Sequence, residues 1–438
     1  MSLVNDAMGL GLRALNRFAG LPLVDRIGLR KPAEKALYQA TRTGFRTVGA
    51  LNRSFGATQK LLKPARLAQG RTPDLFDLSP TEEQQMLRDT VQGFAVEQLR
   101  PAAAAADAAC AAPAALLKQC AELGINMMGV PEELGGVGSE RSVMTNVLVA
   151  EALAQGDMGL AVACLAPSAV SNALVLWGSA EQQSKYLAAF TGEHAPAAAL
   201  AIQEPKPLFD PGVLATRAYA AGGGYVLEGL KSLVPRAAEA ELFIVAAQLE
   251  NRGPALFIVE SSTQGVSIEA EPAMGLRAAS TARLLLNNVR LPASALLGGG
   301  EAEIYRDCVQ LARLGWCALA TGTAQAVLDY VIPYVNERTA FGEPISNRQA
   351  VAFGVANIAI ELEGMRLLTW RAASRAERGQ DFARDTALAR RLCADKGMAI
   401  GNDGVQLLGG HGYVKEHPVE RWYRDLRGAG MIEGVLLV

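Results

Sequence analysis

The sequence contains few of the residues on which metal and thiol chemistry depend. Its 438 residues include only three histidines and six cysteines, and no two cysteines form a CxxC pair. Scattered cysteines are typical of a reducing compartment and do not match the spacing of a zinc knuckle or a disulfide scaffold. We therefore predict no metal site, and a His-Asp relay has little support.

The chain also lacks a strong charge and a long apolar run. Its formal net charge is -2 and its isoelectric point is about 6.1, so no basic field attracts nucleic acid. No uninterrupted apolar span reaches about 18 residues, the length that a transmembrane helix needs. The N-terminus lacks the charged start and compact apolar block of a secretion signal. We expect a soluble, cytoplasmic protein.

Residues 1–78 form a basic extension. Twelve lysines and arginines lie between Arg13 and Arg66, against three acidic residues in the first 66 positions. Several of the basic residues line one helical face, with apolar residues on the other, which predicts an amphipathic helix. Two interpretations stay open. The helix docks on its own domain, or residues 1–70 lie on a partner or on the anionic surface of the inner membrane.

The rest of the chain predicts an α+β protein of three parts. Residues 79–196 carry alanine-rich helical patterns, beginning with Ser79 as a helix N-cap and Pro80 at the first helical position. Residues 197–298 contain short apolar runs separated by turn residues, which is the pattern of a small antiparallel β domain. Residues 299–438 return to helical patterns and predict a helical bundle.

Long helical segments are expected in that bundle around residues 304–337, 346–377 and 384–408. Pro333 lies inside the first of them and is expected to kink or interrupt the helix, because proline lacks the N–H that the helix needs.

Five motifs, in this order of parts, resemble the acyl-CoA dehydrogenase family. They are "TEEQQMLRDTVQGFA", "PEELGGVG", "MGLRAAST", "ERTAFGEPISNRQA" and "GVQLLGGHGYVKEHPVERWYRD", the last followed by "MIEG". The resemblance covers roughly residues 79 to 435. It implies the helical–β–helical fold, an FAD cofactor and the α,β-dehydrogenation of an acyl-CoA thioester.

The resemblance assigns the catalytic role to Glu433, which lies eight residues beyond Asp425 at the position of the family's catalytic carboxylate. This base removes a proton from the carbon next to the thioester while a hydride leaves the β carbon. Apolar neighbours such as Ile432 are expected to surround the carboxylate, so that desolvation raises its proton affinity. Gly434 would keep the backbone slim beside the substrate.

Further site residues are carried over by motif. Arg313 matches an arginine that lines the acyl-CoA channel, although a salt bridge explains it equally well. Arg277 matches a loop near the active site. Arg338 can pair with a diphosphate, and Phe341 can lie against an adenine or ring edge, with ordinary core packing as the alternative. The remaining cofactor-binding residues are Gln203, Gln349, Gln406, Gly409 and Gly410.

The sequence departs from the family pattern on the side of the reactive flavin ring. The usual small turn after Thr-Glu-Pro is replaced by "QEPKPLFD", and Pro235 stands where a residue would offer a hydroxyl and an N–H. Val435 replaces the threonine that follows the catalytic Glu-Gly, and the sequence stops at Val438, where relatives usually carry a further helix. Either other groups such as Arg236 or backbone amides hold the ring, or the flavin chemistry has decayed.

Three hypotheses therefore stand. The first is an FAD-dependent acyl-CoA dehydrogenase of fatty-acid or related acyl chains, a homodimer or homotetramer that shares its cofactor sites. The resemblance implies an electron-transfer flavoprotein as its acceptor. The second is an acyl-CoA oxidase, in which oxygen reoxidises the flavin. The third is a flavin-free relative that acts in binding or assembly, since a fold alone does not fix a function.

Overall fold

The computed structural model describes residues 78–136, 138, 141–192 and 195–433. The predictions made for the basic extension up to residue 77, and those for Gly434 and Val435, fall outside these residues. They remain predictions.

The first part of the described chain is helical. Its first helix begins two residues later than the sequence suggested. Thr81, not Ser79, is the N-cap, because its hydroxyl accepts from the Gln84 N–H at 3.2 Å while the Gln84 side chain accepts from the Thr81 N–H at 3.0 Å. The helices are α4 (Glu82–Phe94), η2 (Ala95–Leu99), α5 (Arg100–Ala109), α6 (Ala114–Glu122), α7 (Val143–Gly156), α8 (Met158–Trp177) and α9 (Ala180–Phe190).

Helix α8 is the central helix of this part and carries no charged residue along its 20 residues. Within the described residues it is the one helix long and apolar enough to cross a membrane by length and composition. However, 94% of its most apolar window is buried inside the molecule. The apolar surface of α8 is therefore covered by its own protein.

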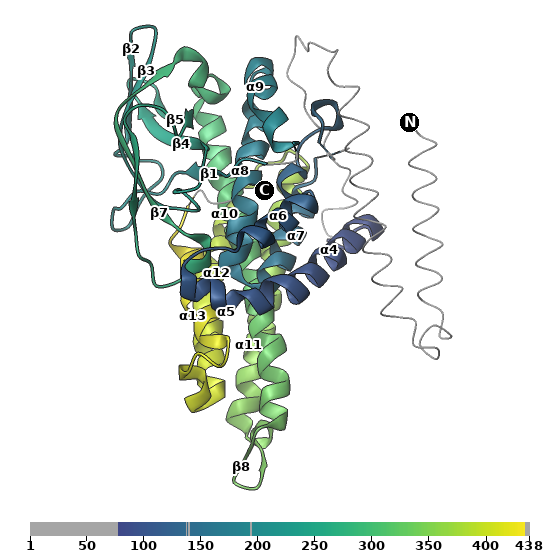
Figure 1. Cartoon of the computed structure of the whole chain (residues 1–438). Coiled ribbons are helices and arrows are strands. Elements are labelled where there is room, and N and C mark those ends of the chain that lie inside the picture. The colour runs from purple at the N-terminus through teal and green to yellow at the C-terminus, as the bar shows by residue number, and fades with distance from the viewer. Residues whose placement is uncertain (1–77, 137, 139–140, 193–194, 434–438) are drawn as a thin grey trace.

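The middle part is a seven-stranded sheet, placed to one side of the helices (Figure 1). The sheet is mixed, because β4 pairs in parallel with both β1 and β2, while the other pairings are antiparallel. The prediction of a purely antiparallel sheet was thus wrong for two pairs. The two parallel pairs involve β1 and β2, which are rich in alanine and lack the β-branched residues that mark the other five strands. The sequence pattern therefore did not reveal these two strands. The strands are β1 (Ala198–Ala201), β2 (Arg217–Ala221), β3 (Gly224–Val234), β4 (Leu242–Leu249), β5 (Gly253–Glu260), β6 (Val266–Ala270) and β7 (Ala282–Pro292).

The last part is a bundle whose long helices match the predicted segments within a few residues. Helix α10 runs through Pro333 without interruption, so the expected interruption was wrong, whereas the expected kink stays a prediction. The carbonyl that the proline leaves unpaired belongs to Asp329, and both residues are exposed, so water can satisfy it. The helices are α10 (Ala302–Glu337), α11 (Gln349–Glu377), α12 (Ala383–Leu408) and α13 (Val419–Leu426).

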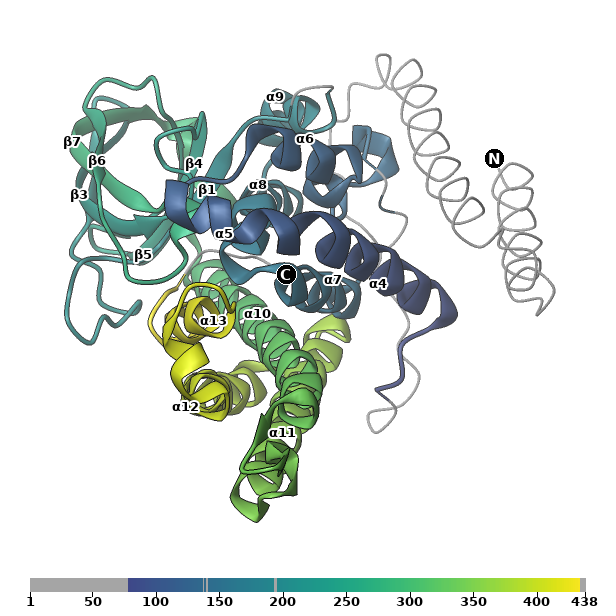
Figure 2. The same ribbon diagram turned by 60° about the horizontal axis from the view of Figure 1, so that its bottom comes forward.

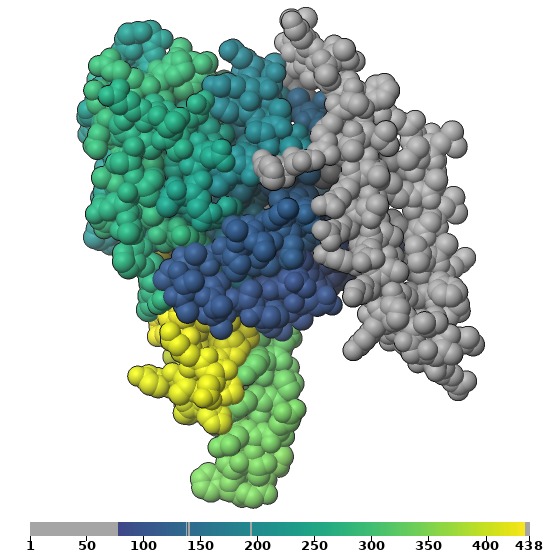
Figure 3. Space-filling view, viewed as in Figure 1, coloured from purple at the N-terminus to yellow at the C-terminus, as the bar shows by residue number. Residues whose placement is uncertain are grey.

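Helix α10 is the axis of the molecule, since it packs against α7 and α8 on one side and against α11 and α12 on the other. The view in Figure 2 shows the sheet beside the helices, with α4 and α5 lying across α7 and α8. The lower ends of α11, α12 and α13 project beyond the rest of the molecule (Figure 3).

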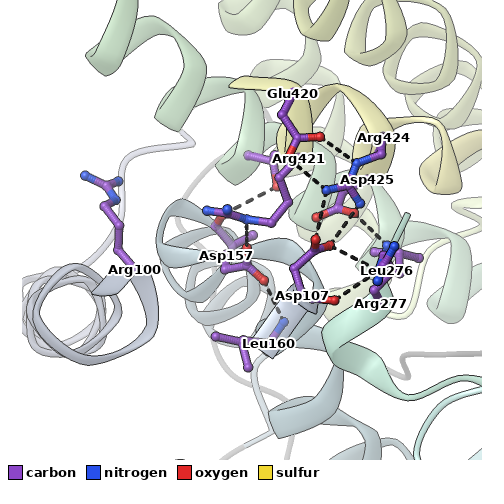
Figure 4. Close-up of polar contacts among 12 residues, drawn as sticks. Arg100, Asp107, Asp157, Leu160, Leu276, Arg277, Glu420, Arg421, Arg424 and Asp425 are labelled. Carbon is purple, nitrogen blue, oxygen red and sulfur yellow. Dashed lines mark hydrogen bonds and ion pairs between the residues drawn. The ribbon is translucent and has the colours of Figure 1, made fainter. Parts of the chain in front are cut away.

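A network of acidic residues and arginines joins the three parts along α13 (Figure 4). Asp107 of α5 binds Arg424 of α13 through both carboxylate oxygens, at 2.9 and 3.0 Å. Its backbone carbonyl accepts from Arg277 of the middle part at 2.9 Å. The bidentate pair fixes both distance and orientation between α5 and α13. Arg277, carried over from a loop near the active site, thus belongs to this junction.

Two buried aspartates complete the junction. Asp157, the N-cap of α8, accepts from Arg421 at 2.8 Å and from the Leu160 N–H at 3.0 Å. Asp425 accepts from the Leu276 N–H at 2.6 Å. Burial, reinforced by the nearby Asp157, raises the pKa of Asp425 to about 8. We therefore expect Asp425 to keep its proton in the folded protein at neutral pH.

This raised pKa gives a prediction for stability against pH. Because the folded-state pKa lies above the unfolded value of about 3.9, the stabilisation by Asp425 is fully present below that value. It is lost as the pH rises through about 8. Asp425→Asn, which keeps an acceptor for the Leu276 N–H, should unfold with a weaker dependence on pH and gain stability relative to the parent at pH 9.

Urea unfolding at pH 5, 7 and 9 measures this difference, with Asp395→Asn, an exposed aspartate of α12, as the matched control. Parallel pH dependence in the parent and Asp425→Asn would show that Asp425 is ionised in the folded protein.

Candidate active site

The turn that carries Glu433 lies flat against two other elements. It begins with η10 (Gly428–Gly430), which follows α13 after Arg427, and Glu433 lies three residues beyond η10. A Cβ on Gly428 would come within 2.8 Å of Leu276, and one on Gly430 within 2.8 Å of the Ala394 Cβ on α12. The absence of side chains at these glycines therefore lets the turn approach both elements closely, and it buries Glu433 to 5% exposure.

The Glu433 carboxylate is bound by two arginines from different helices. Arg313 of α10 donates through Nε to both oxygens, at 3.0 and 3.1 Å, and through Nη2 to Oε1 at 2.9 Å. Arg390 of α12 places Nη2 3.0 Å from Oε1. The Glu433 N–H donates to the Gln203 Oε1 at 3.2 Å, which ties the end of β1 to this turn. Arginines from α10 and α12 thus bind the Glu433 carboxylate, and a residue just beyond β1 binds its backbone.

This geometry corrects the expected surroundings of Glu433. The carboxylate is buried as predicted, but charged partners bind it instead of apolar neighbours, and Met431 is exposed. Both interpretations of Arg313 meet here, because its salt-bridge partner is Glu433 itself. Arg390 was missed. No motif links Arg390 to Glu433. The feature that could have suggested a role is the pair Arg390 and Arg391, which stands among small and apolar residues in "TALARRLCA" of α12.

Other ionisable groups beside Glu433 stay protonated. Burial raises the pKa of Tyr305, whose hydroxyl donates to the Pro211 carbonyl at 2.6 Å. The hydrogen bond to Cys393, together with burial, raises the pKa of the Cys317 thiol. Burial also lowers the pKa of Arg390, an effect that Glu433 opposes. The charge around Glu433 is therefore set by its two guanidinium partners.

The loop that replaces the family's small turn is held by a buried ion pair. Glu204 binds Lys231 of β3 at 2.8 Å, and both side chains are almost fully inaccessible. Glu204 also accepts from the N–H groups of Ala215 and Thr216, at 2.7 and 2.9 Å. Burial lowers the pKa of Lys231 to about 8, against the effect of Glu204. The pair closes the loop at its base, next to Gln203.

The residues around Pro235 have few donors left for a ligand. The Leu233 N–H donates to Glu271 at 2.7 Å and the Arg236 N–H to the Ala279 carbonyl at 2.9 Å. The Arg236 guanidinium binds Glu239 at 2.9 Å. Because Glu239 is largely exposed, Arg236 can exchange this carboxylate for a ligand, which the other donors near Pro235 cannot do as readily. Its proposed role toward a flavin ring stays a hypothesis.

The residues assigned to the adenylate end lie far from Glu433. Arg338 is the C-cap of α10, 25 residues beyond Arg313, which corresponds to roughly 37 Å along a helix. Phe341 is 94% exposed, so core packing is excluded for it. The predicted residues at this end of the bundle are all exposed: Arg338, Phe341, Gln349, Gln406, Gly409 and Gly410.

The chemistry of this end fits a nucleotide. A Cβ on Gly409 or Gly410 would meet open space, and Gly409 has a φ of 59° and a ψ of -131°, so the backbone here is bare and accessible. An exposed guanidinium and an exposed aromatic ring complete a set that suits a diphosphate and an adenine. Since Glu433 is at the other end of α10, one chain does not bring both sets together.

Three family models match successive parts of the chain. The acyl-CoA dehydrogenase N-terminal domain matches residues 81–193, the middle domain 199–289 and the C-terminal domain 302–436. The chain belongs to the acyl-CoA dehydrogenase family. Members of this family are oxidoreductases that use FAD to oxidise acyl-CoA, and the family assignment confirms the fold class predicted from the motifs.

Similar proteins cover most of this family member. The mitochondrial short-chain specific acyl-CoA dehydrogenase of Bos taurus is 37% identical over 365 residues, which span 81% of this chain and 87% of that protein. The structure of butyryl-CoA dehydrogenase from Megasphaera elsdenii has a TM-score of 0.76 and 29% identity, covering 82% of this chain and 96% of the other. A glutaryl-CoA dehydrogenase from Mycobacterium smegmatis in complex with FADH2 has a TM-score of 0.74 and 26% identity, covering 81% and 92%.

The Glu204–Lys231 pair gives a prediction for the stability of this acyl-CoA dehydrogenase family member. Lys231→Met should lower the free energy of unfolding by about 3–5 kcal/mol, because it leaves a buried carboxylate without its cation. The double variant Glu204→Gln/Lys231→Met should recover part of the loss, since no charge then stays buried.

Chemical denaturation at pH 7 measures the change, with Lys206→Met in the exposed part of the loop as control. An effect of Lys231→Met no larger than that of the control would mean that the pair contributes nothing to folding.

Proposed function

We propose that this protein is an FAD-dependent acyl-CoA dehydrogenase in which Glu433 is the general base. The observation that carries the proposal is the burial of this one carboxylate where the sheet, α10 and α12 meet, at the position that matches the family's catalytic residue. Other carboxylates, such as Glu204 and Asp157, are as deeply buried, so it is this position that separates Glu433 from them.

The chain's own residues perform the proton transfer. A Glu433 oxygen takes the proton from the carbon next to the thioester, after one of its hydrogen bonds to Arg313 or Arg390 is given up. The Gln203 side chain holds the Glu433 backbone and so keeps the carboxylate at a fixed place. Bound FAD supplies the acceptor for the hydride from the β carbon. Arg338, Phe341, Gln406, Gly409 and Gly410 are the residues that would hold its adenylate and diphosphate.

Glu433→Gln is the direct test. The amide keeps the shape but cannot take a proton, so dehydrogenation should fall by about 10²–10⁴-fold while flavin binding remains. The absorbance of the purified protein establishes the bound flavin first, and dye reduction with acyl-CoAs of several chain lengths then measures the rate. Glu416→Gln, on an exposed loop, serves as control.

The same assay separates the alternatives. Full activity of Glu433→Gln would remove Glu433 from the mechanism, and a flavin-loaded parent that no thioester reduces would remove the dehydrogenase proposal. Peroxide release without added acceptor favours the oxidase, whereas a colourless protein favours the flavin-free relative. An electron-transfer flavoprotein is the acceptor that the family suggests.

We further propose that two copies of the chain complete each cofactor site. The adenylate-end residues and Glu433 lie at opposite ends of α10, as described above. Helix α11, next to that end, exposes Phe353, Ile360 and Leu367, which are spaced seven residues apart and so lie on one face. Such a stripe suits a second copy, which could then reach the Glu433 of its neighbour with its own adenylate end.

Mixed dimers test this sharing. Glu433→Gln and Arg338→Ala chains carrying different tags should each be inactive alone. A dimer that pairs them contains one intact site if the sites are shared, so co-expression should restore about a quarter of the parent activity. Purification through both tags isolates the mixed dimers, whose specific activity is compared with each single variant. Mixed dimers without recovery would place both residues in one chain's site.

A further inference from the structure

We propose that Arg390 is a positioning residue that fixes the Glu433 carboxylate, and that Arg313 is the partner that releases it for catalysis. This inference rests on the proposed role of Glu433 as the base. It assigns different functions to two guanidinium groups that bind the same carboxylate.

Arg390 holds the turn as well as the carboxylate. Besides its contact with Glu433 at 3.0 Å, its Nη2 lies 3.4 Å from the carbonyl oxygens of both Gly430 and Ile432, and Nη1 lies 3.5 Å from that of Ile432. Ala394, one turn further along α12, lies so close to Gly430 that a Cβ there would come within 2.8 Å of the Ala394 Cβ. One side chain therefore grips the backbone on the N-terminal side of Glu433 and the carboxylate itself.

Arg313 makes a different kind of contact. The hydrogen bonds found for it within the described residues all go to the Glu433 carboxylate. Its side chain is 23% exposed, compared with 14% for Arg390. Arg313 has no hydrogen-bonding partner among the described residues besides the carboxylate, and it is the more exposed of the two, so its side chain can rotate away from Glu433. Arg313 is therefore the mobile partner and Arg390 the fixed one.

The contacts of the two carboxylate oxygens fit this division of roles. Oε1 accepts from both arginines, whereas Oε2 accepts one hydrogen bond, from the Arg313 Nε at 3.1 Å, so Oε2 is the oxygen that can take the substrate proton. Release of Arg313 frees Oε2, while Arg390 still holds Oε1 and the turn. Loss of Arg390 instead lets the turn shift, and a shift of about 1 Å at a reacting group can cost about 100-fold in rate.

Other charged and titratable groups surround Glu433. They are Tyr305 and Cys317 of α10, Cys393 of α12, and the Glu204–Lys231 pair of the middle part. Hydrogen bonding and burial raise the pKa of the Cys317 thiol, burial raises the pKa of Tyr305, and the Glu204–Lys231 pair is neutral overall. Replacing either arginine by a neutral residue therefore changes the net charge around Glu433, whereas these other groups leave it unchanged.

Kinetics of matched variants separate the two roles. Arg390→Met should lower kcat by about 10–100-fold with little change in KM, and Arg390→Lys should recover part of the loss. Arg313→Met should retain more activity, and its kcat/KM should need a higher pH to reach its plateau, because the ionised carboxylate has lost a cation. Arg391→Met, the exposed neighbour on α12, is the control and should match the parent.

A parent-like kcat in Arg390→Met, with the parent active, would overturn the assignment and leave the proposed function standing. So would a larger loss of kcat in Arg313→Met than in Arg390→Met.

A second readout does not depend on activity. If Arg390 anchors Glu433, the losses in thermal stability of Arg390→Met and Glu433→Gln should not add, and the double variant should lose less than the two singles together. Additive losses would overturn the anchor. This cycle can be measured even if no acyl-CoA is oxidised, a result that would reject the proposed function alone.

Discussion

A buried carboxylate with two guanidinium partners is the constraint around which this structure is organised. Removing Glu433 from water is costly, and the cost is offset only if its partners are held at hydrogen-bonding distance. Arg313 and Arg390 come from helices that are far apart in sequence, and Gln203 comes from the end of a strand. The site therefore forms only when the sheet and the bundle are docked correctly.

The junction shown in Figure 4 secures that docking. Asp107 and Arg424 fix α5 against α13, and the turn that bears Glu433 begins directly after α13. Glycines make the approach possible: a Cβ on Gly275 would come within 2.4 Å of the Arg424 carbonyl oxygen. The position of Glu433 is thus set by backbone contacts between the middle loop and α13, and its carboxylate is then held by the two arginines.

The sequence motifs were sufficient for the family, the order of the parts and the place of Glu433 in the fold. Periodicity located the long helices because each buries a broad apolar face. It missed β1 and β2, whose alanines fit a helix as well as a strand, and it overestimated the effect of Pro333, which the exposed side of α10 accommodates. Arg390 could not be predicted, because its role depends on how α12 meets a turn some forty residues later. Burial of Glu433 was foreseen, but its ion pairs required the three-dimensional arrangement.

The uncharged, apolar surface of helix α8 matters while the chain is being synthesised, before it has folded. Its uncharged surface is covered by α7, which precedes it, and by β1, α9 and α10, which follow it in the chain; α10 begins more than a hundred residues later. During synthesis this segment therefore precedes part of its cover by several seconds at about 5–20 residues per second. Until then part of this apolar surface is exposed, and exposed apolar surface in an incomplete chain favours aggregation.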